Sequence, residues 1–93
     1  MSDLLRLQLT WDEPADGTRR SPVLMLPIAL GREFAAMPAQ WNNQRVSRMV
    51  LHDSQISQFH ALIECVDGAI VITDQGSRLG MLVNGTRQQR VIL

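Results

Sequence analysis

Hydrophobic and polar residues alternate over short stretches of this chain, and this alternation predicts strands rather than helices. Leucines occupy every second position of residues 5–9, and residues 59–66 alternate in the same way. A period of two is typical of a strand with one buried face. Residues 23–30 form a longer apolar run, in which Pro27 predicts an edge or bulged strand because proline cannot donate a hydrogen bond to a sheet.

Turn-forming residues separate these stretches. The sequence Asp-Glu-Pro-Ala-Asp-Gly at residues 12–17 should break the chain before the second apolar run. Asp67-Gly68 predicts a tight hairpin, and Asn84-Gly85 a second one, since both central residues of a type I′ turn need a positive φ. The strands expected to flank the two hairpins are residues 59–66, 69–74, 81–83 and 86–93.

The remaining segments are predicted as loops and very short strands. Residues 33–48 are mixed in character and are predicted as an ordered loop with a helical turn, and residues 49–51 as a short strand. Residues 52–58 and 75–80 are predicted as polar loops. Many short strands divided by turns predict an all-β fold, either a sandwich or a barrel.

Length and composition are those of one small globular domain, residues 1–93. Hydrophobic residues make up 45% of the chain and charged residues 19%, which is too apolar for a disordered segment. No apolar run approaches the roughly 20 residues of a transmembrane helix. The first residues also lack the pattern of a secretory signal. We therefore expect a cytoplasmic protein with no membrane partner.

Charge and cysteine content bear on several classes of function. Nine acidic and nine basic residues balance to a formal net charge of zero, so no overall basic field favours nucleic acid. All nine basic residues are arginine, whose planar guanidinium suits phosphate, but composition alone favours biased residue usage as the explanation. The single cysteine, Cys65, predicts neither a disulfide nor a metal site, and its alternating stretch predicts a small buried hydrophobe. No metal or other cofactor is expected.

Four short motifs occur in the order and approximate spacing of a known family. They are Gly31-Arg32, Ser57-x-x-His60, Asp74-x-Gly76-Ser77-x-x-Gly80 and Val83-Asn84-Gly85. Each motif alone is a weak signal. Taken together, the four motifs make the chain, from about residue 24 to its end, resemble the forkhead-associated (FHA) family. The resemblance implies an FHA-type β-sandwich of short antiparallel strands, whose loops at one end bind phosphothreonine peptides in a partner protein. It implies a binding module and not an enzyme.

The resemblance also implies roles for individual residues. Arg32 matches the family arginine that contacts phosphate, and Ser57 matches the serine whose hydroxyl donates to a phosphate oxygen. Gln58 and Arg78 stand at variable loop positions that face the ligand in relatives. The residues expected to support the binding loops are Gly31, His60, Gly80, Asn84 and Gly85.

Several positions depart from the family pattern. Leu79 and Met81 stand where relatives often carry asparagine and threonine, so two polar groups are lost, and Gln55 is neutral where some relatives are basic. Residues 33–48 include an insertion, which predicts either a partner surface of arginine and aromatic residues or a small core capped by Trp41. Two functions are therefore open: a phosphothreonine-dependent adaptor, and a phosphate-independent domain for protein interaction or oligomerisation.

A hydrolase is the third hypothesis, since Ser57, His60 and Asp74 are the residue types of a catalytic triad. An extended chain, however, points residues three apart to opposite faces, and the sequence has no Gly-x-Ser-x-Gly elbow. No catalytic residues are therefore expected.

Family members continue past the Asn-Gly hairpin into further strands. The resemblance therefore predicts an open sheet here, either in a fragment truncated at its C-terminus or in a homodimer completed by strand exchange.

Overall fold

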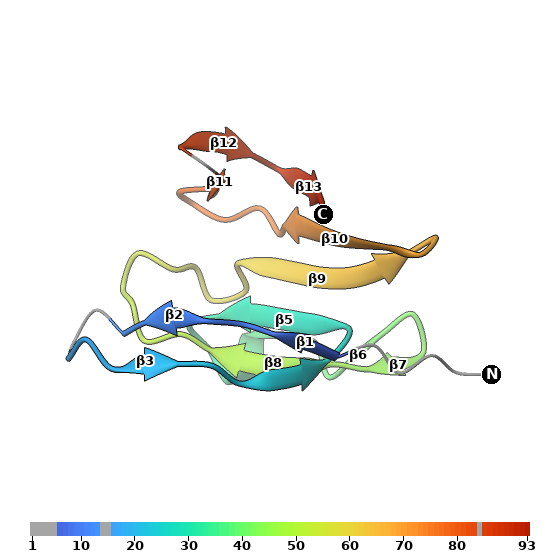
Figure 1. Ribbon diagram of the computed structural model, residues 1–93, viewed down its shortest axis with the longest axis horizontal. Helices are drawn as coiled ribbons and strands as arrows, with labels where there is room; N and C mark the ends of the chain where they lie inside the picture. The colour runs from blue at the N-terminus through green and yellow to red at the C-terminus, as the bar shows by residue number, and fades with distance from the viewer. Residues whose placement is uncertain (1–5, 14–15, 84) are drawn as a thin grey trace.

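The computed structural model describes residues 6–13, 16–83 and 85–93, and their regular structure is almost entirely strand (Figure 1). One 3-10 helix, η1, spans Phe34–Ala36. The all-β prediction is thus confirmed. No helix in these ranges is long and apolar enough to cross a membrane. The strands are β1 (Arg6–Gln8), β2 (Trp11–Asp12), β3 (Arg19–Arg20), β4 (Val23–Met25), β5 (Ile28–Gly31), β6 (Gln40–Trp41), β7 (Gln44–Arg45), β8 (Ser47–Val50), β9 (Ala61–Val66), β10 (Ala69–Asp74), β11 (Met81–Val83), β12 (Thr86–Gln88) and β13 (Arg90–Ile92).

A five-stranded sheet forms the centre of the molecule, in the order β13-β10-β9-β5-β8. Four two-stranded sheets accompany it: β1-β4, β2-β3, β6-β7 and β11-β12. In Figure 1, β1 to β4 lie at the β5 and β8 end of the central sheet, and β11 and β12 lie at the β10 and β13 end. The pairs are antiparallel except β5 and β8, which run parallel because the chain crosses over between them through η1, β6 and β7.

The β9–β10 hairpin follows the sequence pattern closely. Asp67 and Gly68 both have a positive φ, 51° and 80°, as a two-residue primed turn requires. β10 spans the predicted residues 69–74, whereas β9 begins at Ala61 because residues 59 and 60 still belong to the preceding loop. Local turn chemistry is therefore sufficient to fix the register of this pair.

Pro27 does not mark an edge strand, and that prediction was wrong. The proline divides the apolar run into β4 and β5, and β5 lies inside the central sheet between β8 and β9. Pro27 itself lies between the two strands, where its missing N–H is not needed, and its carbonyl accepts the N–H of Ser47 at 2.9 Å. The residue that breaks one strand thus starts another in a different sheet.

Residues 33–48 are more ordered than a loop. Asn42 and Asn43 both have a positive φ and form the turn of the β6–β7 hairpin. This segment covers one face of the central sheet, because Met37 and Val46 form a buried cluster with Ala29 and Leu62. Trp41 packs against the cluster and its indole N–H donates to the Glu64 carboxylate at 3.0 Å. The small core that the insertion was expected to form thus has a counterpart in this cluster. The alternative, a partner surface of arginine and aromatic residues, has a counterpart in Phe34, which is 52% exposed and lies under the Arg48 guanidinium.

The opposite face of the central sheet carries mainly isoleucine. Cross-strand register places Ile28 opposite Ile63, Ile63 opposite Ile72, and Ile70 opposite Cys65, so these side chains share what we call the isoleucine face. Ile28 and Ile63 are fully buried there. Cys65 is exposed, which corrects the prediction that it is a buried hydrophobe. Its alternation was identified correctly, but the isoleucine face is uncovered at this position.

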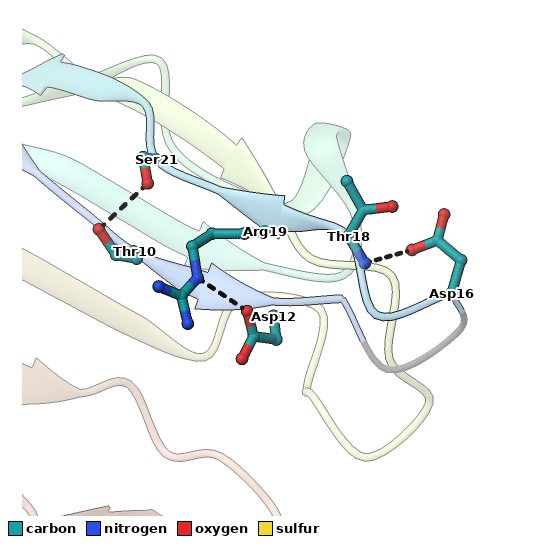
Figure 2. Close-up of polar contacts among 6 residues, drawn as sticks. All are labelled: Thr10, Asp12, Asp16, Thr18, Arg19 and Ser21. Carbon is teal, nitrogen blue, oxygen red and sulfur yellow. Dashed lines mark hydrogen bonds and ion pairs between the residues drawn. The ribbon is translucent and has the colours of Figure 1, made fainter.

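Polar side chains form contacts along the β2–β3 hairpin (Figure 2). The Arg19 guanidinium donates to the Asp12 carboxylate at 3.1 Å, and the Thr18 main-chain N–H donates to Asp16 Oδ1 at 2.9 Å. The hydrogen bond from Thr18 lowers the pKa of the Asp16 carboxyl below its ordinary value, because it favours the charged form. The chain is thus broken before the second apolar run, as expected, and β2 pairs with β3 in an antiparallel hairpin.

Candidate functional site

A polar groove of about 450 Å³ lies where the loop preceding β9 meets the loop following β10. Two main-chain hydrogen bonds hold the first of these loops beside the end of β5. The Arg32 N–H donates to the Ser57 carbonyl, and the Glu33 N–H donates to the Gln58 carbonyl. The residues that line the groove are Arg32, Ser54, Gln55, Ile56, Ser57, Gln58, Phe59 and Arg78.

Gly31 allows this close approach of loop and strand. A Cβ atom at Gly31 would lie 2.1 Å from the Gln58 carbonyl oxygen and 3.2 Å from the sulfur of Met37. No side chain fits at such a distance from main-chain atoms. The glycine of the Gly-Arg motif is therefore required for the position of the loop, and its φ is not positive.

The Arg32 side chain is exposed, and its position is fixed by a hydrogen bond from Nε. Its Nε–H donates to the Ile56 carbonyl at 3.0 Å. This contact uses one donor of the guanidinium and leaves the terminal nitrogens, which are the part of the fork that grips an oxyanion. The side chain is thus oriented by the same loop that forms the floor of the groove.

Ser57 joins the two loops. Its Oγ accepts the main-chain N–H of Arg78 at 3.0 Å, so the loop after β10 is anchored on the loop before β9. A hydroxyl oxygen that accepts one hydrogen bond still has its own proton to donate. Ser57 Oγ is therefore chemically suited to donate to an anion in the groove.

His60 forms a second link between the loops. Its Nδ1 accepts the Ser57 main-chain N–H at 3.0 Å, and its Nε2 lies 2.8 Å from the Gly80 carbonyl oxygen. Because Nδ1 is an acceptor, Nε2 carries the proton and donates to Gly80. The imidazole lies outside the groove lining and contacts main-chain atoms of both loops.

The loop after β10 is stabilised by its own polar residues. The Ser77 hydroxyl donates to the Asp74 carboxylate and accepts the Gly80 N–H at 2.9 Å. Gly80 has a φ of 77°, which an L-residue rarely adopts. The Asp-x-Gly-Ser-x-x-Gly motif therefore encodes a compact turn that presents Arg78 at the groove.

The lining carries two arginines and, among the described residues, no carboxylate. Arg32 and Arg78 approach from different loops, so a ligand between them meets cationic groups from two directions. The arrangement favours an anion that has several oxygens, such as a phosphate group.

The structure brings together four residues that the sequence assigned to ligand binding: Arg32, Ser57, Gln58 and Arg78. Leu79 is 42% exposed and lies outside the lining. Of the expected loop supports, Gly85 has a φ of 82° in its hairpin, and Asn84 lies outside the described residues. Sequence reasoning missed Ser54, Ile56 and Phe59, none of which is a defining residue of a motif; the only signal for them was their position near Ser57.

The contacts of Ser57, His60 and Asp74 differ from those of a catalytic triad. The chain between Ser57 and His60 is turned and not extended, so the two residues do meet, contrary to the sequence argument. They meet through the main-chain N–H of Ser57, whereas a triad requires the hydroxyl. The Asp74 carboxylate binds Ser77.

A solved structure of Mycobacterium tuberculosis EmbR in complex with a low affinity phosphopeptide is similar over 95% of this chain, with 21% sequence identity and a TM-score of 0.58. This chain spans 20% of the length of that one. A search of curated proteins found no match. The family model of the FHA domain matches residues 28–93, which include every residue lining the groove, and the chain therefore belongs to the FHA family.

Proposed function

We propose that this domain binds phosphothreonine in a partner protein and serves as an adaptor in signalling or assembly, without catalysing a reaction. The observation that supports the proposal best is the groove itself, where Arg32, Ser57 and Arg78 come together from separate segments. The EmbR complex is consistent with it, because that related fold was solved with a phosphopeptide.

In this proposal the phosphate lies against the Arg32 guanidinium and the Ser57 hydroxyl. A dianionic phosphate accepts several charge-assisted hydrogen bonds, and Arg32 offers the terminal nitrogens that its contact with Ile56 leaves. Ser57 Oγ donates its proton while it holds the Arg78 N–H. One side chain thus couples phosphate binding to the position of the second loop.

Gln58 and Arg78 contact the peptide around the phosphothreonine. Both side chains are exposed and line the groove. Arg78 supplies a cation to the phosphate or to an acidic neighbour of it, which compensates for the polar groups lost at Leu79 and Met81. The preference for phosphothreonine over phosphoserine belongs to the proposal and rests on family membership.

The direct test is fluorescence anisotropy with a degenerate phosphothreonine peptide library and its unphosphorylated counterpart. We expect binding of the phosphorylated library only. Charge-assisted hydrogen bonds contribute about 1.5–3 kcal/mol, so Arg32→Ala should weaken binding by about tenfold or more. Because the Arg32 side chain is exposed, the fold should survive the loss of its hydrogen bond to Ile56, which circular dichroism would verify.

Arg45→Ala is the matched control, because it removes the same charge from an exposed position on the β6–β7 hairpin, outside the groove. Its affinity should stay within about twofold of the wild type. Equal or absent binding of both libraries would replace this proposal by the phosphate-independent interaction domain. A phosphoserine library provides the separate test of the threonine preference.

A further inference from the structure

A third arginine lies against the loop that presents Arg78. Arg87 belongs to β12, and its side chain packs on Gly80: a Cβ atom at Gly80 would lie 3.2 Å from Cδ and Nε of Arg87 and 3.3 Å from its Cγ. Gly80 follows Arg78 by two positions along the chain. The aliphatic part of the Arg87 side chain therefore rests on this loop, at a residue that has no side chain of its own to exclude it.

The loop under Arg87 has a fixed position relative to the groove. The Gly80 carbonyl lies 2.8 Å from His60 Nε2, which donates to it, and the Arg78 N–H donates to Ser57 Oγ at 3.0 Å. Ser57 and Arg78 both line the groove. Through Gly80, the Arg87 side chain is thus placed beside the wall of the groove that carries Arg78.

The Arg87 guanidinium is exposed and carries a charge that the fold does not use. Within the ranges that the structure describes, Arg87 makes no ion pair, whereas Arg19 and Arg20 on β3 each contact a carboxylate, of Asp12 and of Glu13. A guanidinium forms its strongest hydrogen bonds with a carboxylate or phosphate. Arg87 is therefore available to an acidic group from outside the chain.

We propose that Arg87 binds an acidic side chain flanking the phosphothreonine, so that the domain selects phosphothreonine peptides rich in aspartate or glutamate. This inference rests on the proposed phosphopeptide function and names the class of peptide. With the phosphate held by Arg32 and Ser57, the peptide that passes Arg78 meets Arg87 next, where a carboxylate accepts hydrogen bonds from the guanidinium. The two cations at this wall also disfavour a lysine or arginine in the same part of the peptide.

The test compares two synthetic peptides in which phosphothreonine is flanked on both sides either by glutamate or by alanine. We expect fluorescence anisotropy to show tighter binding of the glutamate peptide by the wild type. Arg87→Met retains an aliphatic side chain to pack on Gly80 and removes the charge. An exposed charge pair contributes modestly, so this variant should bind the glutamate peptide about three- to fivefold more weakly and the alanine peptide with unchanged affinity.

Arg45→Met is the matched control, because it removes the same charge from an exposed position on the β6–β7 hairpin, far from β12 in Figure 1. It should change the affinity for neither peptide. A wild type that binds both peptides equally, or an Arg87→Met protein that binds both more weakly by the same factor, would overturn the role of Arg87 and leave the proposed function intact. A wild type that binds neither peptide would overturn the proposed function, and this inference with it.

Discussion

Replacing Gly31 by alanine tests the packing of the site without changing its charged groups, because the substitution adds only one methyl group. The new Cβ would lie 2.1 Å from the Gln58 carbonyl oxygen, so the Gln58 peptide must retreat by roughly 1.3 Å to reach ordinary contact. Met37 blocks adjustment on the other side, since its sulfur would be 3.2 Å away and its side chain is buried.

The expected cost has two parts. Overpacking of a well-packed site costs about 1–3 kcal/mol. The retreat also strains the hydrogen bonds from Arg32 and Glu33 to the carbonyls of Ser57 and Gln58, each of which contributes about 1 kcal/mol. We therefore expect the free energy of unfolding to fall by about 2–4 kcal/mol and phosphopeptide affinity to fall with it.

Urea denaturation followed by tryptophan fluorescence measures the first quantity, and anisotropy measures the second. Gly68→Ala is the comparison, because that glycine has a φ of 80° in the β9–β10 turn and its Cβ would meet no atom within 4 Å. The free energy of unfolding of Gly68→Ala should fall by about 1 kcal/mol because of backbone strain, and its affinity for the phosphopeptide should not change. A Gly31→Ala protein with wild-type stability and affinity would refute the close contact on which the site description rests.

Two further predictions concern regions outside the groove. The depressed pKa of Asp16 stabilises the folded state above the ordinary carboxyl pKa, and this small effect is lost as the pH falls through the folded pKa. Denaturation at several pH values should therefore show Asp16→Ala differing from wild type at neutral pH and converging with it in acid; a constant difference would contradict this. Trp41→Phe removes the hydrogen bond to Glu64 and should cost about 1–2 kcal/mol in urea denaturation, whereas an unchanged stability would show that the bond contributes nothing.

The parts of the fold that local chemistry determines could be predicted from the sequence. The β9–β10 hairpin follows from alternation and from Asp67-Gly68, and β11 has the predicted residues 81–83. Asn42-Asn43 is an equally local signal for a hairpin, since both residues adopt the positive φ of its turn.

Other features depend on contacts between distant segments. Alternation assigns Cys65 to the isoleucine face but does not say whether another layer covers that position. Likewise Pro27 restricts hydrogen bonding locally, whereas the place of β5 inside the sheet is decided by its pairing with β8 and β9.

The candidate site was accessible from the sequence only through motifs. Arg32 and Ser57 were identified because their neighbours Gly31 and His60 form recognisable patterns. The reason for those patterns appears only in three dimensions, where Gly31 admits the Gln58 peptide and His60 joins two loops. Ser54, Ile56 and Phe59 define no pattern and line the groove because of their place in the loop.

The imidazole link between the loops also bears on the thermodynamics of recognition. Because His60 and the Ser57 hydroxyl already hold both loops, their conformational entropy is lost when the protein folds and not when the ligand arrives. A preorganised groove of this kind should bind without a large rearrangement of its main chain. The affinity then depends mainly on how well the side chains of Arg32 and Arg78 match the ligand, so evolution can change specificity at those two positions while the framework that supports them stays constant.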